Sequence, residues 1–290
     1  MAEGAGLHTE MEGDVVLLGL IGDHIDESQA PYLHRAAGRL LGKTVRYDLL
    51  VPGRMGMSFE AAFAYCEARG YRALNITYPY KERVTALVDG TGSEVIKIGS
   101  ANTVKFEGRP PRAFNTDFTG FVAAFRQMLV DQSPGRVCMI GCGGVGKAVA
   151  HGLVALGARE LVLVDCDPVR AQTLADTLRA IYDDIAVEVT VDAVLAARGA
   201  SGLVNCTPLG MYDNPGSPLD GAAMSGATWA FDAVYTPVDT DFLRMAAANG
   251  LRCLSGYELH FYQGLHAAEI IHGETIDLQS LRDALTETRD

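Results

Sequence analysis

Short apolar runs alternate with longer stretches that suit amphipathic helices through most of the chain. This alternation predicts an α/β fold with largely parallel sheets. A first helix is predicted to begin near Pro31, because proline favours the first helical turn. A second is predicted over 58–69, where Ser58 can cap the start and Gly70 can end the helix. The predicted strands of this first unit are 15–21, 47–51, 73–77 and 101–106.

The alternation starts again at Arg136 and marks a second unit. Its predicted elements are a strand at 137–140, a glycine-rich turn at 141–146, a helix at 147–156, and strands at 161–164, 187–191, 203–205 and 229–232. We expect residues 118–130 to link the two units. The tail, 259–286, is predicted to be helical without a strand partner, and therefore to pack back on the first unit.

Composition narrows the class of protein. The chain has 290 residues, of which 48% are hydrophobic and 21% charged, which is typical of globular proteins of about two domains. A net charge of −12 lacks the basic excess of nucleic-acid binders, so no nucleic-acid partner is expected.

The N-terminal stretch and the cysteines bear on the compartment. The first fourteen residues contain four acidic side chains and no Lys or Arg, so we expect no signal or transit peptide. The apolar run at 15–21 is too short to cross a bilayer, and we expect a cytoplasmic protein without a membrane partner. The six cysteines show neither CxxC nor zinc spacing, and we interpret them as small buried hydrophobic residues.

The most specific motif is the turn Gly141-Cys-Gly-Gly-Val-Gly146, which follows a predicted strand and opens a predicted helix. In a dinucleotide site the first glycine permits a tight turn, Gly143 lets the backbone approach a pyrophosphate, and Gly146 lets helix and strand pack closely. The pyrophosphate then meets free N–H groups at a helix N-terminus. Asp165 follows Gly146 by nineteen residues, close to the spacing of about 20 that such sites show.

The sequence of this turn also fits two other structures. With Lys147 it also fits the start of a P-loop, but that motif needs Ser or Thr next, where this chain has Ala148. A glycine turn used only for packing is the second alternative, and Asp165 favours the dinucleotide site over it. A carboxylate there accepts hydrogen bonds from ribose hydroxyls and repels a 2′-phosphate, and the next cation is Arg170. We therefore predict NAD rather than NADP.

Four short polar segments lie at predicted strand ends and loops, at 28–31, 75–81, 100–103 and 115–117. Asn, Thr, Lys and Asp side chains from separate elements are what a polyhydroxylated substrate requires. Taken singly, each segment equally fits a turn, a helix cap or a solvated surface.

These segments carry a family resemblance. Asn75-Ile-Thr-Tyr-Pro-Tyr-Lys81, Ala101-Asn-Thr-Val104 and Phe114-Asn-Thr-Asp-Phe-Thr-Gly120, together with the glycine-rich turn, resemble the shikimate dehydrogenase family, which includes the quinate/shikimate dehydrogenases. Further matching stretches begin at Gly19, Asn205, Asp232 and Gly256, so the likeness covers nearly the whole chain. It implies an N-terminal α/β substrate domain at 1–118, completed by C-terminal helices at 256–290, and a Rossmann-type dinucleotide-binding domain at 119–255.

The resemblance also implies roles for particular residues. Lys81 and Asp117 match the catalytic pair, and a lysine beside an aspartate can relay a proton while hydride leaves to nicotinamide. The implied substrate-binding residues are Ser28, Thr77, Asn102 and Gln263. The implied contacts of the cofactor, NAD, are Gly141, Gly143, Gly144, Val145, Gly146, Asp165, Arg170, Cys206, Thr207, Pro208, Val234, Tyr235 and Gly256.

The implied reaction is the interconversion of a small-molecule cyclic polyol acid, shikimate or quinate, and its 3-dehydro ketone; a homodimer is an open expectation. Two residues depart from the family pattern: Ala30 replaces a carboxylate-binding hydroxyl, and Glu27 stands where His or Arg is common. A related enzyme with a different substrate, a methylenetetrahydrofolate dehydrogenase-like enzyme and a non-catalytic NAD-dependent sensor therefore stay open. The segment 115–117 disfavours the folate enzyme, and the intact Lys81 and Asp117 disfavour the sensor.

The tail contains a cluster of potential metal ligands. His266, Glu269 and His272 step by three along the predicted helix, and His260 precedes them. No HExxH motif is present, so we expect histidines on the surface of a helix and no bound metal.

Overall fold

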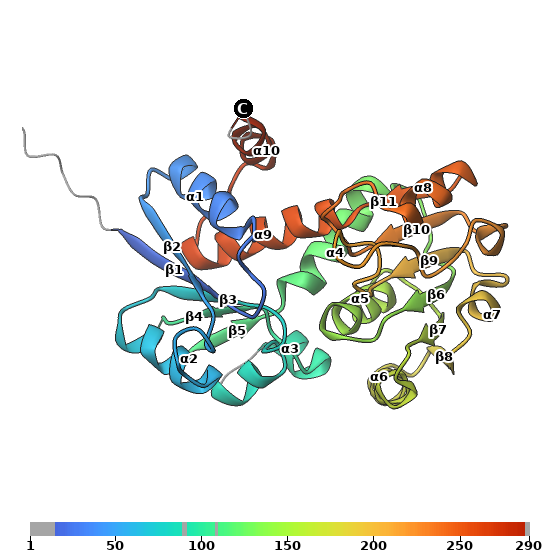
Figure 1. The fold of residues 1–290 in the computed structure, drawn as a ribbon, viewed down its shortest axis with the longest axis horizontal. Coiled ribbons are helices and arrows are strands. Elements are labelled where there is room, and N and C mark those ends of the chain that lie inside the picture. Colours follow the sequence, from blue (N-terminus) through green and yellow to red (C-terminus); the bar gives the residue numbers. More distant parts are fainter. Residues whose placement is uncertain (1–14, 89–91, 108–109, 288–290) are drawn as a thin grey trace, which may run out of the picture.

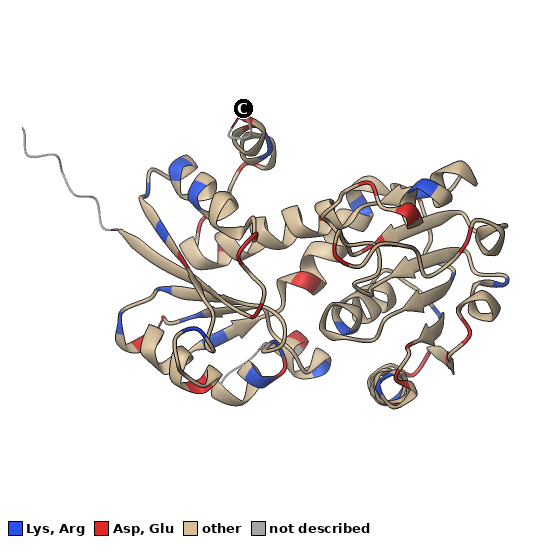
Figure 2. Cartoon of the chain, in the orientation of Figure 1, with Lys and Arg blue, Asp and Glu red and all other residues tan. Residues whose placement is uncertain are grey.

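The computed structural model describes residues 15–88, 92–107 and 110–287. The first fourteen residues, on which the leader-peptide expectation rests, lie outside these ranges. The described elements form two sheets, and helices α4 (Thr116–Met128) and α9 (Gly256–His272) run between them (Figure 1). Acidic and basic residues are spread over both halves of the ribbon (Figure 2). No helix in the described part of the chain is long and apolar enough to span a bilayer.

The first sheet has five strands in the order β2-β1-β3-β4-β5. Its strands are β1 (Val16–Ile21), β2 (Val45–Leu50), β3 (Ala73–Ile76), β4 (Thr103–Lys105) and β5 (Arg112–Phe114). β1 is parallel to β2 and β3, whereas β4 is antiparallel to both of its neighbours. The expectation of a largely parallel sheet is therefore wrong for this edge. Too few residues separate β4 from β5 for the crossover that parallel strands need.

The helices of this unit follow their sequence signals. They are α1 (Ala30–Leu40), α2 (Phe59–Ala68), the 3₁₀ helix η1 (Arg83–Leu87) and α3 (Ser93–Ile98). α1 begins beside Pro31, as predicted. The Ser58 hydroxyl oxygen accepts a hydrogen bond from the Ala61 N–H at 3.2 Å, and Gly70 adopts φ +77° just after α2. Both end signals of α2 are thus confirmed.

The second sheet has six parallel strands in the order β11-β10-β9-β6-β7-β8. Its strands are β6 (Arg136–Ile140), β7 (Glu160–Val164), β8 (Ala186–Thr190), β9 (Gly202–Asn205), β10 (Trp229–Asp232) and β11 (Arg252–Leu254). Its helices are α5 (Gly144–Ala155), α6 (Pro168–Ile181), α7 (Ala193–Ala197), η2 (Ala222–Met224) and α8 (Asp241–Ala248). The direction of winding reverses between β6 and β9, where ligands bind in open α/β sheets.

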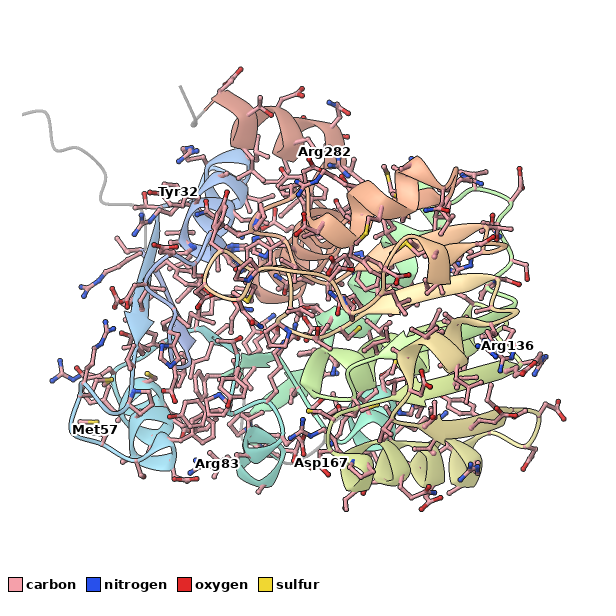
Figure 3. All side chains as sticks on the ribbon, turned by 45° about the vertical axis from the view of Figure 1, so that its right-hand side comes forward. Tyr32, Met57, Arg83, Arg136, Asp167 and Arg282 are labelled. Carbon is pink, nitrogen blue, oxygen red and sulfur yellow. The ribbon has the colours of Figure 1, made fainter. Side chains whose placement is uncertain are left out.

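The C-terminal tail packs back on the first unit, as expected, because α9 and α10 (Leu278–Glu287) both contact α1. Arg282 of α10, labelled in Figure 3, joins α10 to α9. Its guanidinium donates to the Glu258 carboxylate and lies 4.0 Å from the centroid of the Phe261 ring. α9 also crosses α4 at Gly120, where an added Cβ would lie 2.6 Å from the backbone nitrogen of Gln263. The domain boundaries at 118 and 255 stay a prediction.

The cysteines follow the expectation only in part. Cys66, Cys138 and Cys142 are buried, as expected of small hydrophobic side chains. Cys166 is exposed, which corrects it, because it lies in the turn after β7 rather than inside the strand.

Candidate active site

Lys81 and Asp117 form an ion pair between two elements of the first unit. The Lys81 Nζ lies 2.6 Å from Asp117 Oδ2, and the two side chains are only 13% and 8% exposed. Lys81 ends the loop after β3, where its carbonyl accepts a hydrogen bond from the Ala101 N–H at 2.8 Å. Asp117 lies in the first turn of α4. The pair therefore joins a strand end to a helix start, with little water around it.

A network of amide and hydroxyl groups surrounds this pair. Asn115 caps α4, because its side-chain oxygen accepts from the Phe118 N–H at 3.0 Å. The Asn102 side chain accepts from the Thr116 N–H at 2.7 Å and donates to Gln263 Oε1 at 3.3 Å. Asn102, after α3, and Gln263, in α9, are thereby brought together beside the helix that carries Asp117, as the resemblance implies.

The other two implied substrate-binding residues, Thr77 and Ser28, have contacts of their own. Thr77 is partly exposed, and its Cγ2 packs so closely against Gly22 that an added Cβ there would lie 2.2 Å away. The Ser28 hydroxyl oxygen accepts from the Ala30 N–H at 3.3 Å, which leaves its hydrogen available to donate. The Glu27 side chain is exposed, so its carboxylate is not held in a buried position in the site.

The glycine-rich turn is built as the motif predicts. Gly141 has φ +98°, and an added Cβ would lie 2.6 Å from the Cys206 carbonyl carbon. A Cβ on Gly146 would lie 2.1 Å from the Gly141 oxygen, whereas one on Gly143 would meet no atom within 4 Å. α5 begins at Gly144, three residues before the predicted start. Gly143 thus leaves open the space in which a ligand can approach backbone N–H groups at a helix start.

Asp165 is buried at the end of β7, and the structure gives it a second task. One carboxylate oxygen accepts from the Cys142 N–H at 2.8 Å and the other from the Asp167 N–H at 2.9 Å. Arg170 Nη1 lies 3.6 Å from the same carboxylate. Asp165 therefore fixes the glycine-rich turn.

The remaining implied cofactor residues lie at the start of α5, after β9 and β10, and at the start of α9. Val145 lies in the first turn of α5. After β9, the Thr207 hydroxyl donates to the Asn205 side chain at 2.7 Å, and Cys206 and Pro208 flank Thr207. After β10, the Tyr235 ring stacks on His260 with centroids 4.7 Å apart. A Cβ on Gly256 would lie 2.5 Å from the Val234 oxygen, which shows a packing role for this glycine.

Asp232, to which the sequence reasoning assigned no role, organises these loops. Its carboxylate accepts from the Asn205 amide at 3.0 Å, the Val234 N–H at 3.0 Å and the Thr240 hydroxyl at 2.6 Å. Burial raises its pKa to about 6, although these hydrogen bonds act in the opposite direction. Asp232 could have been predicted to have a role from the sequence, because it is a charged residue at the end of a buried strand.

The histidines of α9 are not surface residues, which corrects that prediction. His272 is buried, and burial lowers the pKa values of His272 and His260 to about 4. The His266 ring pairs with the Thr119 hydroxyl at 2.9 Å. The physical reason is that α9 packs on both α1 and α4. Within the described ranges no group of three or more His, Cys, Asp or Glu side chains could hold a metal ion.

Comparisons with known proteins agree with this geometry. Residues 20–104 match the family model of the shikimate dehydrogenase substrate binding domain. The chain is 36% identical to a quinate/shikimate dehydrogenase (NAD(+)) from Corynebacterium efficiens, over 94% of this chain and 98% of the relative. It is also 36% identical to a shikimate dehydrogenase (NADP(+)) from an Arthrobacter species, over 92% of each.

Solved structures show the same fold. Quinate dehydrogenase from Corynebacterium glutamicum in complex with NAD superposes with a TM-score of 0.87 at 31% identity, covering 94% of this chain and 99% of the other. Shikimate 5-dehydrogenase from Thermus thermophilus in complex with NADP(H) and shikimate gives a TM-score of 0.81 at 29% identity, covering 94% and 99%. The two units described above therefore correspond to an N-terminal substrate domain and a Rossmann-type domain.

Proposed function

The chain belongs to the shikimate dehydrogenase family, and we propose that it is an NAD-dependent dehydrogenase interconverting quinate or shikimate with its 3-dehydro ketone. As a member of this family it is an NAD(P)-dependent oxidoreductase with a small-molecule substrate. The observation that carries the proposal is the contact of 2.6 Å between Lys81 Nζ and Asp117 Oδ2.

The Lys81–Asp117 pair is suited to a proton relay. Oxidation of a secondary alcohol removes the hydroxyl proton as hydride departs, so a proton acceptor must lie beside the reacting hydroxyl. In our proposal Lys81 Nζ passes one of its protons to the Asp117 carboxylate as it takes the proton of the hydroxyl, so the pair relays the proton and Lys81 remains an ammonium. In the reverse direction the ammonium polarises the ketone oxygen and returns the proton. The low exposure of both side chains strengthens their interaction, because little water screens it.

The glycine-rich turn fits a dinucleotide. Gly143 leaves the space before α5 open, while Gly141 and Gly146 keep the turn close to the sheet. Backbone N–H groups at the start of α5 would hold a pyrophosphate. When bound, the dinucleotide supplies the hydride acceptor for oxidation.

Asp165 supports NAD as the dinucleotide. A buried carboxylate at the end of β7 favours ribose hydroxyls and repels a 2′-phosphate. Arg170 does not offer an isolated cation there, because its guanidinium lies 3.6 Å from the same carboxylate. The relative from Corynebacterium efficiens is named for NAD and the one from Arthrobacter for NADP, so the choice rests on Asp165.

The substrate assignment rests on the polar groups near the pair. Asn102 and Gln263 would bind ring hydroxyls, and Ser28 and Thr77 would bind further polar groups of the substrate. Ala30 offers no second hydroxyl to a carboxylate, and Glu27 is exposed. We still propose a polyol acid as the substrate. Its carboxylate would be bound more weakly by the single hydroxyl of Ser28 than by two hydroxyls.

The direct test is to follow NAD reduction by the purified full chain with quinate, shikimate, aminoshikimate and carboxylate-free polyols. We expect turnover with quinate or shikimate, and a kcat/KM with NAD at least about tenfold above that with NADP, about 1.4 kcal/mol of preference. Turnover only with a polyol that lacks the carboxylate would overturn the substrate assignment. Measurable NAD binding without turnover of any of these compounds would favour the non-catalytic sensor.

A further inference from the structure

Lys147 is the residue of the glycine-rich motif to which the proposed function gives no task. In a P-loop this lysine would bind phosphate, but Ala148 lacks the hydroxyl that such a site needs. In the structure its ammonium instead lies 2.8 Å from Oε1 of Glu82, and Glu82 directly follows Lys81 in the chain. The ion pair therefore joins the dinucleotide-binding unit to the segment that carries the proposed proton acceptor.

A second contact shares the same face of α5. Gly144 and Lys147 are three residues apart, so they lie on one side of the first helical turn. A Cβ added at Gly144 would lie 3.6 Å from the Cδ of Lys81. Two adjacent residues of the first unit, Lys81 and Glu82, thus meet two residues of a single helical turn from the other unit. Gly144 lies beside the methylene groups of Lys81, and Lys147 neutralises the Glu82 carboxylate.

The same boundary between the units continues along α3. The Lys97 ammonium lies 6.0 Å from the centroid of the Tyr182 ring, which follows α6, within the range of a cation–π contact. The Tyr182 hydroxyl in turn lies 2.9 Å from His151 Nδ1 in α5. α3 and α5 are also in direct contact. The Lys147–Glu82 pair is thus one part of a longer boundary, and Glu82 is the neighbour of Lys81 in the chain.

We propose that Lys147 is a positioning residue of the reaction: its ion pair with Glu82 docks the first turn of α5 on the segment of Lys81 and keeps the Lys81–Asp117 pair covered. This inference rests on the proposed function, because it assigns a consequence to where Lys81 lies. The Lys147 side chain is 19% exposed and that of Glu82 is 55% exposed, so the pair is partly screened by water. Its effect is therefore expected to be modest and dependent on salt.

The test compares Lys147→Met, Lys147→Arg, Glu82→Gln and the double variant Lys147→Met with Glu82→Gln. At low ionic strength we expect Lys147→Met and Glu82→Gln each to lower kcat/KM for quinate or shikimate about three- to fivefold, the range that exposed ion pairs give. The double variant should lose no more than either single variant, because both remove one interaction. Lys147→Arg should retain most of the activity, and about 1 M salt should close the gap to the unmodified protein.

Lys43→Met is the matched control. Lys43 pairs with Glu274 at similar exposure, away from Lys81, and its loss should leave kcat/KM unchanged. Hydrogen exchange gives a readout that needs no turnover. Amides of the 80–88 segment should exchange faster in Lys147→Met than in the control, with the melting temperature of both variants unchanged.

The inference is overturned if Lys147→Met matches the unmodified protein in both kcat/KM and exchange, or if the losses of the two single variants multiply in the double variant. Failure of the proposed function has a different signature, because the unmodified protein would then turn over neither quinate nor shikimate. In that case faster exchange of the 80–88 segment would still support the docking role, and unchanged exchange would overturn it.

Discussion

The glycine-rich turn lies in the second unit and the Lys81–Asp117 network in the first. The two regions also differ in whether backbone or side-chain atoms form them. In the turn, backbone atoms and missing side chains do the work, since a Cβ on Gly141 or Gly146 would collide with neighbouring backbone. In the network, side chains from α4, α9 and the loops around β3 and β4 hold one another. The turn is therefore specified by a short local sequence, whereas the network requires the tertiary fold.

The largest effect is expected on the network side. Asp117→Asn keeps the side-chain shape but removes the charge that faces Lys81 Nζ at 2.6 Å. We expect kcat to fall about 10²- to 10⁴-fold, the range of acid–base contributions, with NAD affinity unchanged. Steady-state kinetics and calorimetric titration with NAD measure the two quantities. Asp176→Asn, an exposed aspartate paired with Arg179, is the control. A comparable loss in NAD affinity would contradict a role confined to the chemical step.

On the turn side, Gly141→Ala should weaken NAD binding about 10- to 100-fold. Positive φ at a non-glycine residue costs about 1–3 kcal/mol, and the collision with Cys206 adds to it. Gly157→Ala is a matched control, because Gly157 has the same φ of +98° but its added Cβ would meet no atom within 4 Å. If both variants bind NAD equally well, the close approach to Cys206 does not shape the site.

The two regions also differ in what the sequence revealed about them. The tight turn at Gly141 and the close packing at Gly146 could be predicted, because steric rules act within a few residues. That α5 starts at Gly144 was missed, because glycine disfavours a helix interior while suiting its first turn. Asp165 was expected to meet a ribose, but its hydrogen bond from Cys142 could not be foreseen, because the two are joined only by tertiary contact.

For the network, single residues could not be separated from ordinary caps and turns by local rules. Asn115 does cap α4, so the alternative interpretation of that segment is also correct. Asn102 and Gln263 are far apart in sequence, and only the family resemblance predicted that they belong to the same site. The antiparallel β4–β5 edge and the burial of His272 were missed because each depends on what packs against the element.

A smaller effect should sharpen the cofactor side of the comparison. Asp165→Asn with Cys166→Arg removes the carboxylate that repels a 2′-phosphate and adds a cation beside it. We expect the ratio of kcat/KM with NAD to that with NADP to fall about tenfold or more, equivalent to about 1.4 kcal/mol. Because Asp165 also holds the Cys142 N–H, the melting temperature must be measured in parallel. An unchanged ratio in a stably folded variant would sink the argument for NAD.

The last effect is one on stability rather than activity, and it concerns the substrate unit alone. His34 is buried against Tyr47, and burial lowers its pKa from 6.5 to about 3. As the pH falls below 6.5, His34 therefore binds a proton in the unfolded chain but not in the folded chain. The contribution of His34 to the free energy of unfolding is fully present above pH 6.5 and declines below it. His34→Phe should remove about 1.4 kcal/mol of this decline per pH unit, as measured by denaturant unfolding between pH 6.5 and 4. His24→Asn, at an exposed histidine, provides the control, and its unfolding is measured over the same pH range.

Lys81→Ala tests the central claim most directly, with kcat for quinate or shikimate and the Kd for NAD measured on the same preparation. If Lys81 takes the hydroxyl proton, kcat should fall by about three orders of magnitude while the Kd for NAD changes less than about twofold. A variant that keeps near-native turnover would contradict the account.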